Sequence, residues 1–341
     1  MTATVFLHVG PYKSGTTFLQ LVLDKNRQAL AGRGYCLPLG ESVQQAIAAV
    51  DVLGKKLHGE GRVHGRWDRL AAEVREWDGP VAVVSAESLS RATKRQVDRI
   101  VSSLEPAEVH VVYTARDLAK VVPSMWQTHM RNKGAMPWRD YLAAVRGDDD
   151  TTPLGRRFWD QQDPREVLSR WAGRVPPERI HVVTVPRSGT DPSLLWQRFC
   201  SVLGLDPSPY SLKVRRANES LGLVEAELLR RLNARVVGDI RGRTYSRWVK
   251  NFIARRVLEQ RPDQRRLVLP AEEHAWLRPR MEEICAYLRE QGYDLVGDLD
   301  DLLPDPAAAT QAASPDTVEA EEVLEAAVDV LAGMVHKLDR S

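Results

Sequence analysis

The chain has 341 residues, a length that suits one α/β domain with additions, and 43% of them are hydrophobic, enough for a sizeable core. The net charge of +2 is too small to indicate a polyanionic partner by itself. The three cysteines are far apart, the chain does not open with a basic segment, and it has no apolar run of about 18 residues. We therefore expect a cytoplasmic protein without disulfides, a zinc site, a signal peptide or a membrane span.

Four short β-rich runs are the candidate strands: Val5–Val9, Val81–Ser85, Val109–Thr114 and Ile180–Val185. Helical patterns lie between them, over Thr17–Leu30, Gln96–Leu104 and Asp191–Leu203. Strands that alternate with helices predict an α/β fold, a three-layer sandwich with a central parallel sheet and right-handed crossovers.

The end of the chain has a different composition. Residues 304–316 form a linker rich in Pro, Ala and Ser, and a last helix is predicted from Val318 to Leu338, within a C-terminal segment 317–341. Its apolar positions form one stripe at i, i+4, i+7, i+11 and i+14: Leu324, Val328, Leu331, Val335 and Leu338. The stripe is expected to dock on the body of the protein or on another subunit, which would make a homo-oligomer. Because the helix is acidic, docking on a membrane surface is disfavoured.

The first candidate strand runs into the loop "GPYKSGTT" (10–17) and then directly into a helix. Gly10 and Gly15 allow the backbone to curl so that successive N–H groups point inward, and the helix start adds unbonded N–H groups and a positive dipole end. Lys13 adds a full charge, and Ser14, Thr16 and Thr17 add hydroxyl donors. The loop therefore predicts an oxyanion site.

This loop is not a Walker A motif, which requires a lysine directly after its second glycine. Here Thr16 follows Gly15, and the lysine lies two places before that glycine. The strand over Val81–Ser85 is followed by Glu87 rather than by an obvious metal-binding aspartate. A site that holds a mono-anionic group through lysine, with no metal, fits better than a triphosphate site.

A second anion motif lies in "VHVVYTARDLAKVVPSMWQ" (109–127). Arg116 ends a β-rich run, and Ser124 follows eight residues later, near the start of a helix. A planar guanidinium can bind two phosphate oxygens at once. Pro123 is unusual in a helix and is expected to set or kink its start.

The two motifs together resemble those of sulfotransferases that use 3′-phosphoadenosine 5′-phosphosulfate (PAPS), and "LHVGPYKSGTTFLQ" is especially similar to bacterial members. The resemblance extends to "RIHVVTVPRSGTDPSLLWQRFCSVLGL" (179–205) and covers roughly residues 4–300. It implies a P-loop-type sandwich over 1–303, PAPS as co-substrate and no metal. It assigns Lys13, Ser14, Gly15, Thr16 and Thr17 to the 5′-phosphosulfate. Arg116 and Ser124 are assigned to the 3′-phosphate. Residues 46–77 and 131–175 would be insertions on the acceptor side.

The catalytic base is expected to be Glu87, just beyond a strand end, where the resemblance also places a glutamate in the heparan-type members. The alternatives are the histidines His129, His58 and His64, with His8 more typical of a hydrogen-bonded strand residue. Lys13 would act on the sulfuryl group and on the bridging oxygen.

Residues 213–266 are basic, with 15 Lys and Arg against 6 Asp and Glu. The resemblance suggests a third contact here, with Arg216 as the candidate. Neither interleaved aromatics nor a known module favours nucleic acid. The acceptor is expected to be a small molecule, glycan or lipid with a hydroxyl or amine. Alternative functions are a catalytically silent PAPS-binding protein and, less favoured, a P-loop kinase.

Overall fold

The computed structural model describes residues 2–55, 63–148, 151–214, 221–305 and 313–339. The residues form two compact units, described separately below. The sheet unit comprises Met1–Asp117, Arg157–Ala217 and Pro279–Leu303, and the helical unit comprises Leu118–Arg156, Asn218–Arg278 and Pro304–Ser341. No helix within the described ranges is both long and apolar enough to cross a lipid bilayer.

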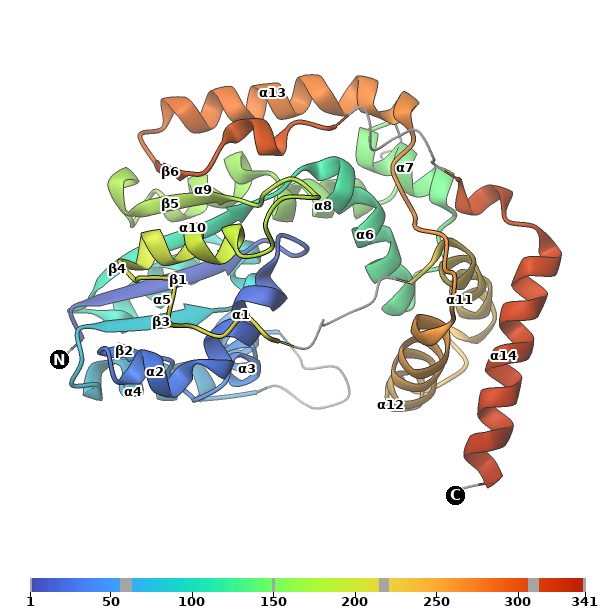
Figure 1. The fold of residues 1–341 in the computed structure, drawn as a ribbon, viewed down its shortest axis with the longest axis horizontal. Coiled ribbons are helices and arrows are strands. Elements are labelled where there is room, and N and C mark those ends of the chain that lie inside the picture. Colours follow the sequence, from blue (N-terminus) through green and yellow to red (C-terminus); the bar gives the residue numbers. More distant parts are fainter. Residues whose placement is uncertain (1, 56–62, 149–150, 215–220, 306–312, 340–341) are drawn as a thin grey trace. The chain divides into compact units, whose positions relative to one another are not determined.

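The sheet unit contains six parallel strands in the order β2-β3-β1-β4-β5-β6, flanked by helices (Figure 1). The predicted α/β fold with a central parallel sheet is therefore confirmed. The strands are β1 (Thr4–Gly10), β2 (Tyr35–Cys36), β3 (Val81–Ser85), β4 (Glu108–Ala115), β5 (Ile180–Thr184) and β6 (Asp294–Val296). The edge strands β2 and β6 were not among the predicted strands, because they are only two and three residues long and carry no periodic pattern.

The helices of the sheet unit are α1 (Thr16–Lys25), α2 (Arg27–Ala31), α3 (Ser42–Val52), α4 (Arg66–Glu76), α5 (Lys94–Leu104), α9 (Pro164–Trp171) and α10 (Leu194–Leu203), with most of α8 (Leu154–Gln162) and α13 (His274–Glu290). Short 3₁₀ turns lie at Glu87–Arg91, Pro177–Arg179 and Leu299–Leu302. On one face of the sheet, Phe6, Val112 and Val183 pack with Leu23 of α1 and Phe199 of α10. The core thus lies directly beneath α1, the helix that follows the predicted anion loop.

One predicted helix is divided in the structure. The pattern over Thr17–Leu30 becomes α1 and α2, with a break at Asn26. The Asn26 side chain donates to the Val22 and Ser211 carbonyls and accepts from the Ser211 N–H. An asparagine that bonds the backbone in this way competes with helix continuation, and Ser211 is too distant in sequence to be anticipated.

The segment 46–77, expected to be an insertion on the acceptor side, also contributes to the hydrophobic core. Its described part includes α4, whose apolar residues are fully or almost fully buried: Trp67, Leu70, Ala71 and Val74. Their spacing of i, i+3, i+4 and i+7 is the stripe of a helix packed on a core. The abundant charges between these positions obscured that stripe in the sequence.

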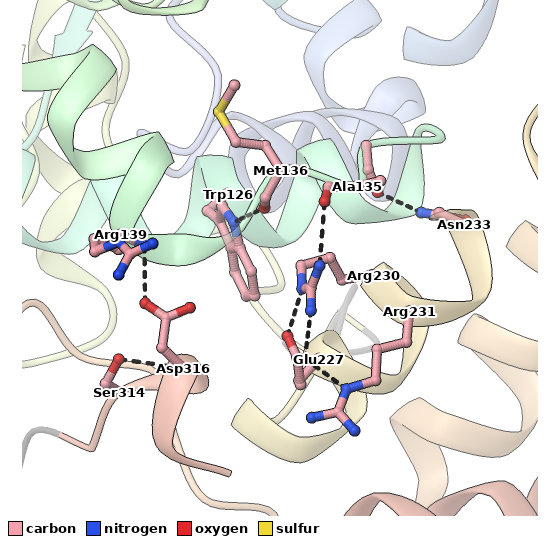
Figure 2. Close-up of polar contacts among 11 residues, drawn as sticks. Trp126, Ala135, Met136, Arg139, Glu227, Arg230, Arg231, Asn233, Ser314 and Asp316 are labelled. Carbon is pink, nitrogen blue, oxygen red and sulfur yellow. Dashed lines mark hydrogen bonds and ion pairs between the residues drawn. The ribbon is translucent and has the colours of Figure 1, made fainter. Parts of the chain in front are cut away.

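The helical unit contains α6 (Leu118–Arg131), α7 (Trp138–Arg146), α11 (Leu223–Val236), α12 (Gly242–Thr244), a π-helix over Tyr245–Val257, and α14 (Ala320–Asp339), with the ends of α8 and α13. Its 3₁₀ turns are Leu258–Gln260, Ala271–Glu273 and Pro315–Thr317. Figure 2 shows how α11 and α6 hold the turn between α6 and α7. Asn233 donates to the Gly134 carbonyl, Arg230 to that of Ala135, and Trp126 to that of Met136.

The C-terminal helix forms close to its predicted position, as α14, but not in the predicted orientation. Val323, Ala326 and Val330 are buried, and α14 contacts α11. The predicted stripe at 324, 328, 331, 335 and 338 is exposed instead. The expectation that this stripe docks on the body of the chain is therefore wrong. Most of the predicted linker 304–316 lies outside the described residues.

Candidate active site

The strand order brings the loop with Lys13 and the end of β4 with Arg116 together. β1 lies between β3 and β4, so the loop after β1 has the β3 and β4 ends as its neighbours. After β1 the chain turns to the β3 side of the sheet, and after β4 it turns to the β5 side, so the direction of the connections reverses between β1 and β4. Ligands of open α/β sheets bind at such a reversal, outside the carboxyl ends of the strands. Glu87, Lys13 and Arg116 follow β3, β1 and β4 respectively, and thus lie at this edge.

The loop from Gly10 to Gly15 has a left-handed backbone at three positions: Gly10 at φ 93°, Lys13 at φ 70° and Gly15 at φ 81°. Gly10 also lies against Glu87, since a Cβ on Gly10 would be 2.8 Å from the Glu87 Cα. Gly15 precedes α1 and provides no side-chain cap, so the first N–H groups of α1 are left to other acceptors. This geometry suits an anion bound by backbone N–H groups.

We expect Gly10→Ala to lower the free energy of unfolding by about 3 kcal/mol, because the new methyl group would combine an unfavourable φ with a clash against backbone. Gly65→Ala is the control: Gly65 has a φ of 74°, but a methyl group there would have no heavy atom within 4 Å, so about 1 kcal/mol is expected. Urea denaturation of both variants measures the difference. Equal losses would show that contact with Glu87 does not constrain the loop.

A buried hydrogen-bond network supports the loop from below. His8 is fully buried, with Nδ1 2.8 Å from Ser85 Oγ and Nε2 3.2 Å from Thr114 Oγ1. Thr114 Oγ1 is also 2.5 Å from Ser14 Oγ and donates to the Gly10 carbonyl. Ser14 Oγ donates to the Pro11 carbonyl at 2.6 Å. These bonds tie β1, β3 and β4 to the loop, so the loop is rigidly placed on the sheet.

Burial lowers the pKa of His8 from 6.5 to about 3, so the ring is neutral at ordinary pH. Between these pKa values the unfolded chain binds one more proton than the folded protein. The free energy of unfolding should therefore fall by about 1.4 kcal/mol per pH unit on acidification from this residue alone. We expect His8→Asn to remove that contribution from the slope measured by urea denaturation between about pH 6 and about pH 4. The exposed His64, changed to Asn, is the control. An unaltered slope in His8→Asn would contradict a neutral His8.

Arg116 extends from the end of β4 to the loop. Its Nη1 donates to the Lys13 carbonyl at 2.7 Å. Burial lowers the pKa of Arg116 and the neighbouring Asp117 opposes that shift, but an arginine stays protonated in proteins. A half-buried guanidinium thus braces the loop and adds positive charge to the edge where Lys13 lies.

Glu87 begins the turn after β3. Gln20 of α1 donates from Nε2 to Glu87 Oε2 at 3.0 Å and also to the Ser85 carbonyl at 3.3 Å. The loop residue Tyr12 lies near the side chains of Glu87 and Arg91. Burial and Glu87 raise the pKa of Tyr12, and Arg91 acts in the opposite direction. Glu87 is therefore positioned by α1 and half-buried beside the loop.

The hydroxyl-bearing residues of the loop are not equivalent. Ser14 is fully buried and uses its hydroxyl within the network, so its side chain shapes the loop in this structure. Thr16 is buried as well, and Thr17, in the first turn of α1, is half-buried. A ligand contact from these three residues would therefore be made most directly by Thr17 and by their backbone N–H groups.

Two of the remaining predicted residues belong to the helical unit. Ser124 is on α6 in the helical unit, where its hydroxyl donates to the Lys120 carbonyl and α6 continues through Pro123. His129 is on the same helix, and its ring lies against Gly134. His64 is exposed. His58 and Arg216 lie outside the described residues. The His8 ring is fully buried, so it cannot contact a bound acceptor substrate.

Four residues at this edge were not among the predicted site residues: Tyr12, Gln20, Thr114 and Gln162. Gln162, which ends α8, donates from Nε2 to the Tyr12 carbonyl at 3.1 Å, and its own carbonyl accepts from Tyr113. Tyr12 lies inside the anion-loop motif itself, so its position in the sequence could have identified it as a site residue. The others are brought to the loop by contacts over long sequence distances, for which the sequence carries no local pattern.

No protein-family model matches the chain, and it matches no curated protein. Among solved structures, it is similar to a crystal structure of a sulfotransferase from Alicyclobacillus acidocaldarius, at 15% identity and a TM-score of 0.40. That match covers 64% of this chain and 87% of the other.

Proposed function

We propose that this protein transfers a sulfuryl group from PAPS to a hydroxyl or amine of an acceptor. The observation that carries the proposal is that two basic groups follow adjacent strands at the reversal of the sheet. The loop with Lys13 follows β1, Arg116 follows β4, and Arg116 donates to the Lys13 carbonyl. PAPS has a phosphosulfate at one end and a 3′-phosphate at the other, so it needs two such groups close together.

In the proposed reaction Glu87 accepts the proton of the acceptor, and the acceptor oxygen or nitrogen forms a bond to sulfur. The bond between sulfur and the bridging oxygen breaks, which leaves adenosine 3′,5′-bisphosphate, and the proton passes later from Glu87 to water. The Lys13 ammonium stabilises the charge that develops on the bridging oxygen. As in phosphoryl transfer, positioning and electrostatics supply most of the catalysis.

The position of the lysine favours this donor over ATP. A Walker A lysine follows the second glycine and opens the helix, whereas Lys13 lies before Gly15 with its backbone at φ 70°. We propose Thr17, the loop N–H groups and Lys13 as the ligands of the phosphosulfate, with Arg116 at the 3′-phosphate. The acceptor would be a small molecule, a glycan or a lipid.

Isothermal titration calorimetry with adenosine 3′,5′-bisphosphate tests the proposal. We expect binding without added magnesium, and at least about tenfold weaker binding of adenosine 5′-monophosphate, which lacks one anchored phosphate. Mass spectrometry of acceptor panels incubated with PAPS should then detect the mass gain of one sulfuryl group. Absence of binding would refute the proposal, as would magnesium-dependent ATP turnover. Binding without transfer to any acceptor would indicate a silent nucleotide-binding protein.

A further inference from the structure

The C-terminal helix α14 has two apolar faces. One face holds the helix on its own unit: Val323, Ala326 and Val330 are buried, and Arg261 and Arg265 form ion pairs with Asp329 and Glu322. The second face is the stripe named above, and each of its five residues is between 54 and 67% exposed. They account for five of the seven large hydrophobic residues that are exposed within the described part of the chain. The stripe is therefore a concentrated exposed surface and not a scatter of single residues.

The spacing of the stripe is that of a coiled-coil seam. The residues follow one another at intervals of four, three, four and three, which are the d and a positions of successive heptads. Ala327 and Ala332, on the two sides of the seam, are small and allow another helix to approach closely. Two heptads are short for an isolated coiled coil, but the opposite face already holds α14 in its helical conformation, so association need not supply the free energy of helix formation.

The size of the stripe also fits pairing with an identical stripe. If each side chain exposes roughly 100 Å², the stripe presents on the order of 500 Å², at the upper end of what soluble monomers leave exposed. Two stripes that face each other would bury on the order of 1,000 Å², which is the lower bound for a specific interface. A second copy of the chain supplies such a complement without any other partner.

The charges beside the seam decide the direction of pairing. Glu321 and Glu325 are exposed in the first two turns of α14, next to the stripe. In a parallel pair the glutamates of the two copies would lie side by side and repel each other. In an antiparallel pair they lie at opposite ends, and the helix dipoles are also opposed.

We infer that α14 joins two copies of the chain in a two-fold symmetric dimer, as an antiparallel helix pair along the stripe from Leu324 to Leu338. This inference is independent of the proposed reaction, because α14 carries none of the residues assigned to it.

Sedimentation velocity of the full chain over a range of concentrations tests the dimer. We expect a dimer, and we expect Leu331→Glu to raise its dissociation constant by at least about 100-fold, because two carboxylates would be buried in the seam. His336→Glu is the matched control, since it places the same charge on an exposed position outside the stripe. Circular dichroism checks whether Leu331→Glu retains its helix content. If it does not, the milder Leu331→Ala provides the test, and it should also weaken the dimer.

A monomeric wild-type protein at every concentration, or a dimer that Leu331→Glu leaves intact, would overturn the inference. So would a monomer that sediments with phosphatidylserine vesicles through this stripe, because a membrane would then be its partner. Direction is tested with Leu324→Cys in a Cys36→Ser background, since Cys200 and Cys285 are buried. The antiparallel dimer should form no disulfide under mild oxidation, and efficient crosslinking at 324 would show a parallel pair.

Discussion

Lys13→Ala should lower the rate of sulfuryl transfer from labelled PAPS by at least about 1,000-fold, equivalent to about 4 kcal/mol of transition-state stabilisation. The ammonium acts where charge accumulates on the bridging oxygen as the bond to sulfur breaks, and no neutral side chain replaces it there. Alanine and lysine tolerate the left-handed backbone at this position about equally, so the substitution should leave the fold unchanged. Urea denaturation checks that assumption on the same sample.

The control for Lys13 is Lys94→Ala, which removes an exposed lysine at the start of α5 in the same unit. Its transfer rate should equal that of the wild type. Lys13→Arg separates charge from geometry, because it retains the positive charge but replaces the compact ammonium by a planar guanidinium. We therefore expect this variant to bind nucleotide more weakly than the wild type and to show little turnover. Unchanged turnover in Lys13→Ala would remove the loop from the reaction and refute the proposed chemistry.

Glu87→Gln should reduce kcat by about 100-fold to 10,000-fold while the KM for PAPS stays within a factor of about three. Glutamine has almost the same shape and still packs against Gly10 and beside Gln20, but it cannot accept the acceptor's proton. Because the base acts on the acceptor and not on the donor nucleotide, the loss belongs in kcat. Steady-state kinetics with a confirmed acceptor measures the two constants separately.

Glu76→Gln, at an exposed position of α4, is the control for this loss of one carboxylate and should leave both constants unchanged. The matched variant Gln20→Leu leaves Glu87 chemically intact and removes the hydrogen bond that positions it. We expect a smaller fall in kcat, about tenfold, with the same KM for PAPS. If Glu87→Gln retains wild-type kcat, the alternative histidines become the candidates for the base, and His129→Asn, His58→Asn and His64→Asn are the variants to measure.

Much of the sheet unit could be predicted because its signals are local. The predicted ends of β1, β3, β4 and β5 agree with the structure to within one residue, since each strand is a short run of β-branched and aliphatic residues. The start of α5 carries a capping box, in which Thr93 and Gln96 bond each other's backbone. The site loop is equally local: its glycines, lysine and hydroxyls lie within eight consecutive residues, and both glycines have a positive φ.

The tertiary structure alone decided what surrounds that loop. The order β3-β1-β4 brings Glu87 and Arg116 to opposite sides of the loop, and Arg116 contacts a carbonyl 103 residues away in the chain. The fold also places Ser14 and His8 in one buried hydrogen-bond network, because Thr114 bonds to both side chains. The two faces of α14 illustrate the same limit. Helical spacing identified an apolar stripe, but another, smaller set of residues packs on the unit. Spacing along a helix specifies which residues share a face, whereas the face that becomes buried depends on the shape and charge of the surface opposite it.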